Sequence, residues 1–166
     1  MFIYKALKNI FVNPEKYKKI FLEVMESEKI TALFIETQQA RLAYSGETIY
    51  GKPIETKKAA DGFPYARSTV RRKKAKNRPY NIVTLKDTGQ FYSTMDLLFD
   101  GFIMSFDAFF GKQDGNILDN FDKEFTPSTL LGVTDEEFNY ILREAIFPFF
   151  ILRLNAYFSA QISRIS

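Results

Sequence analysis

The chain has 166 residues and a formal net charge of +3, and it contains no Cys, no His and no Trp, but 18 Phe and 9 Tyr. The missing residue types exclude disulfides, thiolate nucleophiles, Ser-His-Asp triads and imidazole metal ligands. Catalysis would have to rely on carboxylates, Lys, Tyr or Ser, so the composition predicts a protein that is no enzyme and uses no metal or cofactor. The many aromatic residues predict a well-packed core, with some rings left for contacts between subunits.

Residues 1–44 are predicted to form a helical N-terminal part. Apolar residues recur at helical spacing over residues 2–12, and Pro14 then marks the start of a second helix. The apolar stripe of this second helix slips in phase at residues 27–29, which predicts a long helix with a kink. Gly46 is a natural stop for it.

Residues 45–80 show no helical or alternating period, and they predict a long basic arm with room for one short helix over 66–76. The net charge is +9 from residue 52 to 86 and −9 from 87 to 144. Three interpretations are open: a solvated loop, pairing with the acidic segment within one chain or between copies, and a nucleic-acid or phosphate contact. The close charge balance ranks nucleic acid last. The candidate contact residues are Arg67, Arg71, Arg72, Lys73, Lys74, Lys76 and Arg78.

Residues 81–133 are predicted to form an antiparallel sheet. Tyr80–Lys86 is rich in β-branched residues, and apolar residues alternate with polar ones over residues 91–99 and 102–110. The dipeptide Asp100-Gly101 between these two runs predicts a two-residue type I′ hairpin turn. Leu130–Val133 is expected to add a short strand.

Residues 134–160 are predicted to form a C-terminal helix packed on the sheet. Thr134 and Glu137 have the spacing of a capping box, and a kink is expected near Pro148. The fold class is therefore α+β, in a single domain over residues 1–166. The longest strongly apolar run, Ala145–Leu152, is too short to span a bilayer, so we expect no membrane partner and synthesis in a cytoplasm.

Asp87-Thr88-Gly89 follows an apolar stretch, as it does in aspartic proteases. Such a site needs two carboxylates that share one proton, so a single copy would require a homodimer. Lys86 and Gln90 argue against this, because the protease pattern has apolar and small residues at their places. The simpler interpretation is that Asp87 turns the chain and that Gly89 takes a positive φ.

The stretch Val83–Tyr92 resembles the L-x-D-T-G-x-[FL] segment of small neck proteins of tailed bacteriophages, of the tail-completion or head–tail joining type. The version that it resembles is found in phages and prophages of Bacteroides-type hosts. Its Gly-x-x-x-x-Gly turn and Tyr-x-x-x-Thr-x-x-x-Lys stretch are matched upstream. Residues 75–78 stand where that pattern has a Gly-containing turn, which is a departure. The matching upstream residues are Gln39, Leu42, Gly46, Gly51, Ile54, Tyr65, Ala66, Thr69, Lys73 and Lys74.

The resemblance implies a virion structural protein that does no chemistry. Neck proteins form rings that join the portal and head to the tail, so the implied partners are copies of the chain itself and the portal, adaptor and tail proteins. The implied location is the virion neck or tail, after assembly in the host cytoplasm. On this hypothesis residues 45–80 form an inter-subunit arm that lies on the acidic sheet of the next copy. A nucleic-acid-binding module that uses residues 67–78, including contact with DNA in the lumen, is the first alternative, and the homodimeric protease is a distant one.

Overall fold

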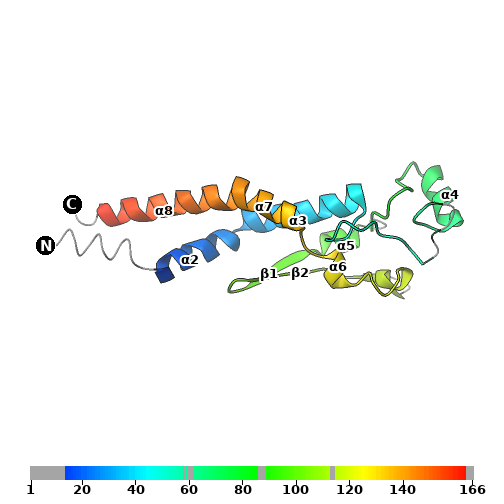
Figure 1. Cartoon of the computed structure of the whole chain (residues 1–166), viewed down its shortest axis with the longest axis horizontal. Helices are drawn as coiled ribbons and strands as arrows, with labels where there is room; N and C mark the ends of the chain where they lie inside the picture. Colours follow the sequence, from blue (N-terminus) through cyan, green and yellow to red (C-terminus); the bar gives the residue numbers. More distant parts are fainter. Residues whose placement is uncertain (1–13, 58, 60–61, 86–88, 113–114, 164–166) are drawn as a thin grey trace. The chain divides into compact units, whose positions relative to one another are not determined.

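The computed structural model describes residues 14–57, 59, 62–85, 89–112 and 115–163 (Figure 1). The chain divides into two compact units. The helical unit combines the chain up to Leu33 with the chain from Phe138, and the mixed unit covers Phe34–Glu137. Helices dominate and the strands are antiparallel, so the predicted α+β class is confirmed. The predicted helix over residues 2–12 lies outside the described residues.

The helical unit is built on the packing of α2 (Pro14–Met25) against α8 (Phe147–Ile162). Edge-on ring contacts join the two helices, with Phe21 and Phe150 centroids 5.6 Å apart and Tyr17 and Phe158 centroids 6.3 Å apart. The sequence predicted a C-terminal helix packed on the sheet; in the structure this helix packs on α2. The reason is that the apolar stripe of α2 carries aromatic side chains that pack against the rings of α8.

The N-terminal helices break and stop where the sequence predicts. Between α2 and α3 (Glu28–Ala40) the chain turns at Ser27, whose hydroxyl donates to the Val24 carbonyl at 2.6 Å. α3 continues into a π-helical turn, η1 (Arg41–Ser45), which ends at Gly46. Gly46 has φ 67° and donates its N–H to the Arg41 carbonyl at 3.0 Å, so the predicted glycine stop is confirmed.

The mixed unit holds a core of buried apolar residues to which α3, η1 and the loops all contribute. Four short helices surround it: α4 (Arg67–Ala75), α5 (Gln90–Ser93), η2 (Ile117–Asn120) and α6 (Pro127–Leu130). The short helix expected at 66–76 is thus confirmed as α4. The core members include Phe34, Leu42, Ile54, Val83, Phe91, Phe121 and Leu130.

The predicted sheet over residues 81–133 is much smaller in the structure. Among the described residues it consists of two separate two-stranded ladders, β1 (Asp96–Asp100) with β2 (Ile103–Asp107), and β3 (Gly111–Lys112) with β4 (Gly115–Asn116). The predicted first strand, Tyr80–Lys86, is irregular over all of its described residues, 80–85. Leu85 itself has φ 51°, a left-handed conformation that ends an extended run.

Two further strand predictions are wrong for local reasons. Residues 90–93 form α5 because Gly89, with φ 86°, lets the chain turn into a helix there. Leu130 belongs to α6, whose start is set by Thr126 and Pro127 at the N-cap and first-turn positions. Each segment is short and has few buried apolar residues, Phe91 in the first and Leu130 and Leu131 in the second. So few positions show no period that separates a strand from a helix.

The predicted hairpin is confirmed, with a shift in its turn. Leu97 and Phe99 face inward on β1, while Asp100 pairs with Ile103, so the two turn residues are Gly101 and Phe102. Gly101 has φ 60° and Phe102 does not have a positive φ. The turn is therefore of the II′ pattern and lies one residue later than the predicted Asp-Gly turn of type I′.

The C-terminal helical segment runs through α7 (Asp135–Ile141), a π-helical stretch η3 (Leu142–Ile146) and α8. The capping box is confirmed: Thr134 N–H donates to Glu137 Oε2 at 2.7 Å, and Glu137 N–H donates to the Thr134 hydroxyl at 3.1 Å. The π-helical stretch ends two residues before Pro148. The ring of Pro148 and its missing N–H disturb the regular backbone hydrogen bonds of an α-helix there.

By length and composition, Asp135–Ile162 is long and apolar enough to cross a membrane, and little of its apolar window is buried. Length and composition alone assign no membrane to it. Arg153 and Asn155 lie within its apolar part, and charged side chains at the centre of a bilayer are costly. The absence of a membrane partner stays a prediction.

Candidate functional site: a cationic cleft beside helix α4

Helix α4 gives the basic segment a fixed shape within the mixed unit. Val70 is its one buried residue, and this single anchor leaves the basic side chains on the other faces. The helix ends at Ala75 with Lys76 as its C-cap, and Asn77 then takes φ 50°. Asn is the residue other than Gly that best tolerates this conformation. Asn77 therefore turns the chain after α4 within residues 75–78, where the sequence has no glycine.

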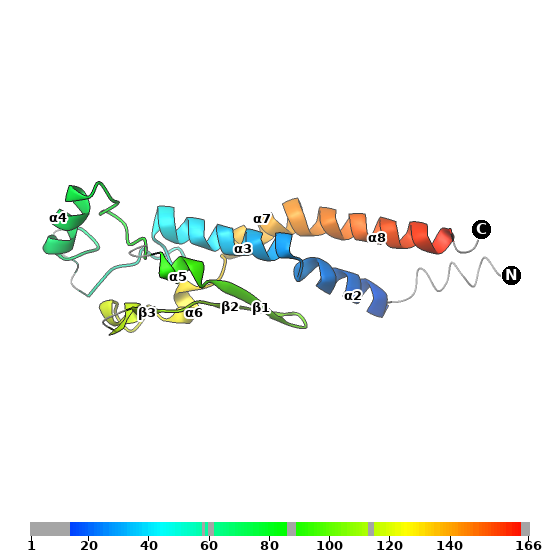
Figure 2. The same cartoon turned by 180° about the vertical axis from the view of Figure 1, so that it is seen from behind.

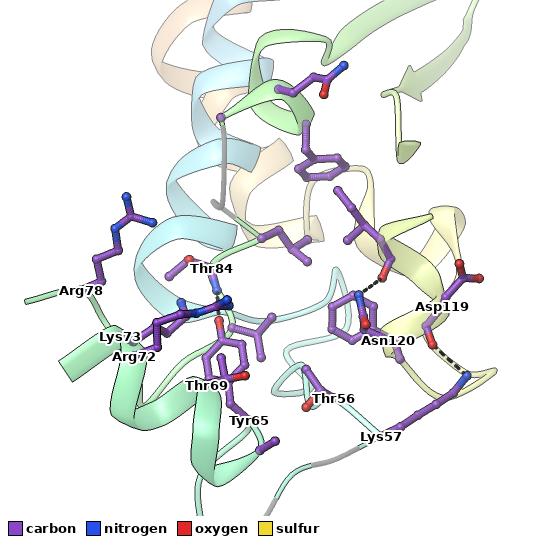
Figure 3. A pocket seen from close by; sticks show the side chains of 18 of the residues that line it. Thr56, Lys57, Tyr65, Thr69, Arg72, Lys73, Arg78, Thr84, Asp119 and Asn120 are labelled. Carbon is purple, nitrogen blue, oxygen red and sulfur yellow. Dashed lines mark hydrogen bonds between the residues drawn. The ribbon is translucent and has the colours of Figure 1, made fainter. Parts of the chain in front are cut away.

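A cleft of about 550 Å³ lies beside α4 (Figure 3). Its apolar lining comes from core residues, among them Val83, Leu85, Phe91 and Phe121. The charged residues of its lining are mostly cationic, with Lys57, Arg72, Lys73, Lys76 and Arg78. An apolar floor with a cationic wall can bind an anionic group that carries an apolar side chain beside it.

The seven predicted contact residues separate into two groups. The cleft brings together Arg72, Lys73, Lys76 and Arg78, whereas Arg67, Arg71 and Lys74 do not line it. The sequence did not point to Thr56 and Lys57, which line the same cleft from an irregular segment, or to Asn120 at the end of η2. No local signal could have found them, because their place depends on how this segment and η2 pack beside α4.

The Tyr-x-x-x-Thr-x-x-x-Lys stretch of the resemblance forms one side of the cleft. Tyr65, Thr69 and Lys73 are four residues apart and all three line it (Figure 3). Lys73 Nζ lies 4.4 Å from the centroid of the Tyr65 ring and donates to the Pro79 carbonyl at 3.1 Å. Lys74 Nζ lies 4.6 Å from the centroid of the Tyr80 ring. Both lysine side chains therefore contact aromatic rings. Lys73 is half-buried, and Arg72, Lys74 and Lys76 are exposed.

Two tyrosines hold the backbone at the base of the cleft. Thr84 N–H donates to the Tyr65 hydroxyl at 3.3 Å, and the Tyr92 hydroxyl donates to the Thr84 carbonyl. Gln39 Nε2 in turn donates to the Tyr92 carbonyl at 2.9 Å. Burial, and to a smaller extent the nearby Tyr65, raises the pKa of Tyr92. Tyr92 therefore stays neutral near pH 7. Both tyrosine hydroxyls serve as structural hydrogen-bonding groups.

Carboxylates compensate only part of the cationic charge. Of the described lining residues, Asp119 alone is acidic, and its Oδ2 accepts the Asn116 N–H at 2.9 Å as a cap of η2. Among the residues that the structure describes, an ion pair joins the basic and acidic segments, between Lys52 Nζ and Glu124 Oε2 at 2.6 Å. Pairing inside one chain thus occurs outside the cleft, and the cleft keeps its surplus positive charge.

The Asp87-Thr88-Gly89 motif is described only at its last residue. Gly89 has φ 86° and stands at the N-cap of α5, as the simpler interpretation expected, whereas Asp87 and Thr88 lie outside the described residues. Of the other motif glycines, Gly51 has φ 71° and turns the chain between Thr48 and Lys52. These glycines adopt backbone conformations that other residues rarely take.

No protein-family model, no curated protein and no solved structure matches this chain. Its function is therefore inferred from its own residues and geometry.

Proposed function

We propose that the chain is a virion structural protein of a tailed bacteriophage, a ring-forming neck component that joins the portal and head to the tail. The observation that carries this proposal is the exposed apolar surface of α8. This helix has no fully buried residue, although it is strongly apolar, and Phe147, Ile151, Leu152 and Ile162 are largely exposed. Large exposed apolar surfaces of this kind are typical of subunit contacts.

The placement of the motif residues supports the same proposal. Leu42, Ile54 and Tyr65 belong to the core of the mixed unit, and Thr69 and Lys73 line the cleft. The residues that match the phage pattern therefore form two groups: some pack in the core of the mixed unit, and others line its surface cleft. This division is expected for a protein that works by contact with its neighbours.

The test is a measurement of native mass on the purified full-length chain. A ring component is expected to give one discrete oligomer whose copy number does not change with concentration, since a head-to-tail contact closes on itself. A chain that stays monomeric at all concentrations would contradict the proposal. Asp87→Asn should leave the oligomer unchanged, whereas a dimeric protease would lose all cleavage activity with this substitution.

The cationic cleft favours one second candidate, a nucleic-acid-binding module. Contacts to phosphates release counterions, so the affinity for DNA would fall steeply with salt. A titration of duplex DNA at two ionic strengths separates the candidates. The ring component proposed here should bind DNA weakly or not at all while its native mass stays that of the oligomer.

A further inference from the structure

The β1–β2 hairpin presents an acidic and apolar face to solvent. Residues 96–107 hold three Asp and no Lys or Arg. In the observed register Asp96, Leu98 and Asp100 lie on the exposed face opposite Asp107, Ser105 and Ile103. At the turn, Phe102 is 61% exposed and Ile103 is 66% exposed. Such rings and aliphatic side chains are expected to be covered in the assembled protein.

The charge arrangement on this face is unfavourable in a single chain. Asp96 and Asp107 stand directly opposite each other in the ladder, and like charges at such positions destabilise a strand pair. Each accepts the N–H of the next residue in sequence, Leu97 or Ala108, through one carboxylate oxygen. A cationic surface placed against the hairpin would remove this repulsion.

The cleft beside α4 complements the hairpin in both charge and polarity. It has five cationic side chains and one carboxylate among its described lining residues, and its floor is apolar. The hairpin turn and α4 lie at opposite ends of the mixed unit in both views (Figures 1 and 2). The two surfaces therefore do not meet in one copy, yet they are placed for a head-to-tail contact between copies.

We propose that the hairpin turn of one copy inserts into the α4 cleft of the next. Phe102 then covers the apolar floor, and the three aspartates face the cationic wall. This proposal rests on the proposed function, because it specifies the ring contact. A phosphate backbone has no apolar group that would cover the apolar floor of the cleft. The cleft therefore fits this hairpin better than it fits DNA.

Charge reversal on each surface tests the contact in the full-length chain. One variant carries Lys57→Glu, Arg72→Glu and Lys76→Glu, and the other carries Asp96→Lys, Asp100→Lys and Asp107→Lys. Lys73 and Lys74 are left intact because they stack on core rings. Each variant alone should be folded by circular dichroism yet monomeric by native mass, and an equimolar mixture should associate again, since each cleft then meets a hairpin of opposite charge.

A second measurement does not depend on these charge changes. The chain has no Cys, so Thr69→Cys with Ile103→Cys introduces the only thiols. Under mild oxidation this pair should yield a ladder of covalent multimers, because a disulfide forms only between closely placed residues. The matched control replaces the cleft position with an exposed one outside it, Lys123→Cys with Ile103→Cys, and should yield no ladder.

The outcomes separate this proposal from the function on which it rests. A monomeric wild-type protein would contradict the ring itself. A wild-type oligomer that persists in both charge variants, or that gives no ladder with the cysteine pair, would overturn the hairpin contact alone. Loss of salt-sensitive DNA binding in the Lys57, Arg72 and Lys76 variant, with an unchanged native mass, would also overturn it and assign the cleft to nucleic acid.

Discussion

Arg41 and Glu137 form an ion pair in the interior of the mixed unit, with Arg41 Nε 3.4 Å from Glu137 Oε2. The Arg41 side chain is 6% exposed, and its two terminal nitrogens donate to the carbonyls of Glu47 at 2.6 Å and Gly132 at 2.7 Å. Glu137 Oε2 also accepts the Thr134 N–H of the capping box. One guanidinium thus joins η1, the loop after it and the start of α7.

The contributions of Arg41 and Glu137 to the free energy of unfolding should be strongly coupled. Burial lowers the pKa of Arg41, while the Glu137 charge acts in the opposite direction. Removal of one partner of a buried pair typically costs about 3–5 kcal/mol, because the other charge is left uncompensated. We expect Arg41→Met to lower the free energy of unfolding by this amount, and Arg41→Met with Glu137→Gln to cost less than the sum of the two single changes. Urea unfolding of the four proteins measures this, and additive losses would contradict the coupling.

A substitution at Gly46 should destabilise the fold for two reasons, and a matched control can separate them. It has φ 67°, and a Cβ placed there would lie 3.0 Å from the Val83 carbonyl oxygen. Gly51 has nearly the same φ, 71°, but no atom lies within 4 Å of a Cβ there. Gly51→Ala should cost about 1–2 kcal/mol for the left-handed backbone alone. Gly46→Ala should cost more by thermal unfolding, and equal losses would show that the close approach to Val83 carries no energy.

Tyr92 should make the mixed unit sensitive to alkaline pH. Its pKa is raised in the folded state above the ordinary value near 10, chiefly by burial. The stability due to its neutral hydroxyl is therefore fully present below about pH 10 and is lost as pH rises from there through the folded-state pKa. Tyr92→Phe removes the hydrogen bond to the Thr84 carbonyl.

We thus expect Tyr92→Phe to be less stable than wild type near pH 8 and the difference to shrink above pH 10. Denaturant unfolding at pH 8, 10 and 11 measures this trend. A difference that grows with pH would contradict the assigned direction of the shift.

The exposed face of α8 should affect assembly without affecting the fold. Ile151 and Leu152 are largely exposed in the single chain. Glu at both positions should therefore leave the unfolding midpoint of the chain nearly unchanged and shift its native mass toward the monomer. The control is Phe150→Ala on the same turn, which removes the ring contact with Phe21 and should lower the unfolding midpoint. A large loss of stability in the double Glu variant would show that this face is already used within the chain.

The sequence predicted the features whose causes are local. The break at Ser27, the stop at Gly46, the capping box of Thr134 and Glu137 and the alternation around the hairpin depend on residues a few positions apart. Helix caps and strand alternation are recognised over such short distances, so the α+β class follows from them. The change from a basic to an acidic segment near residue 86 was also predictable, because it needs only a count of charged residues along the chain.

Tertiary structure decided the rest. The segment before Leu85 looks like a strand, but the tyrosines 65 and 92 hold its backbone and no strand lies beside it among the described residues. Arg41 is one cation among many in the sequence, yet packing places it in the core. The cleft gathers Lys57, α4 and η2 from separate stretches of the chain. A sequence pattern records what each residue prefers next to its neighbours, whereas burial and pairing depend on which distant segments fill the same space.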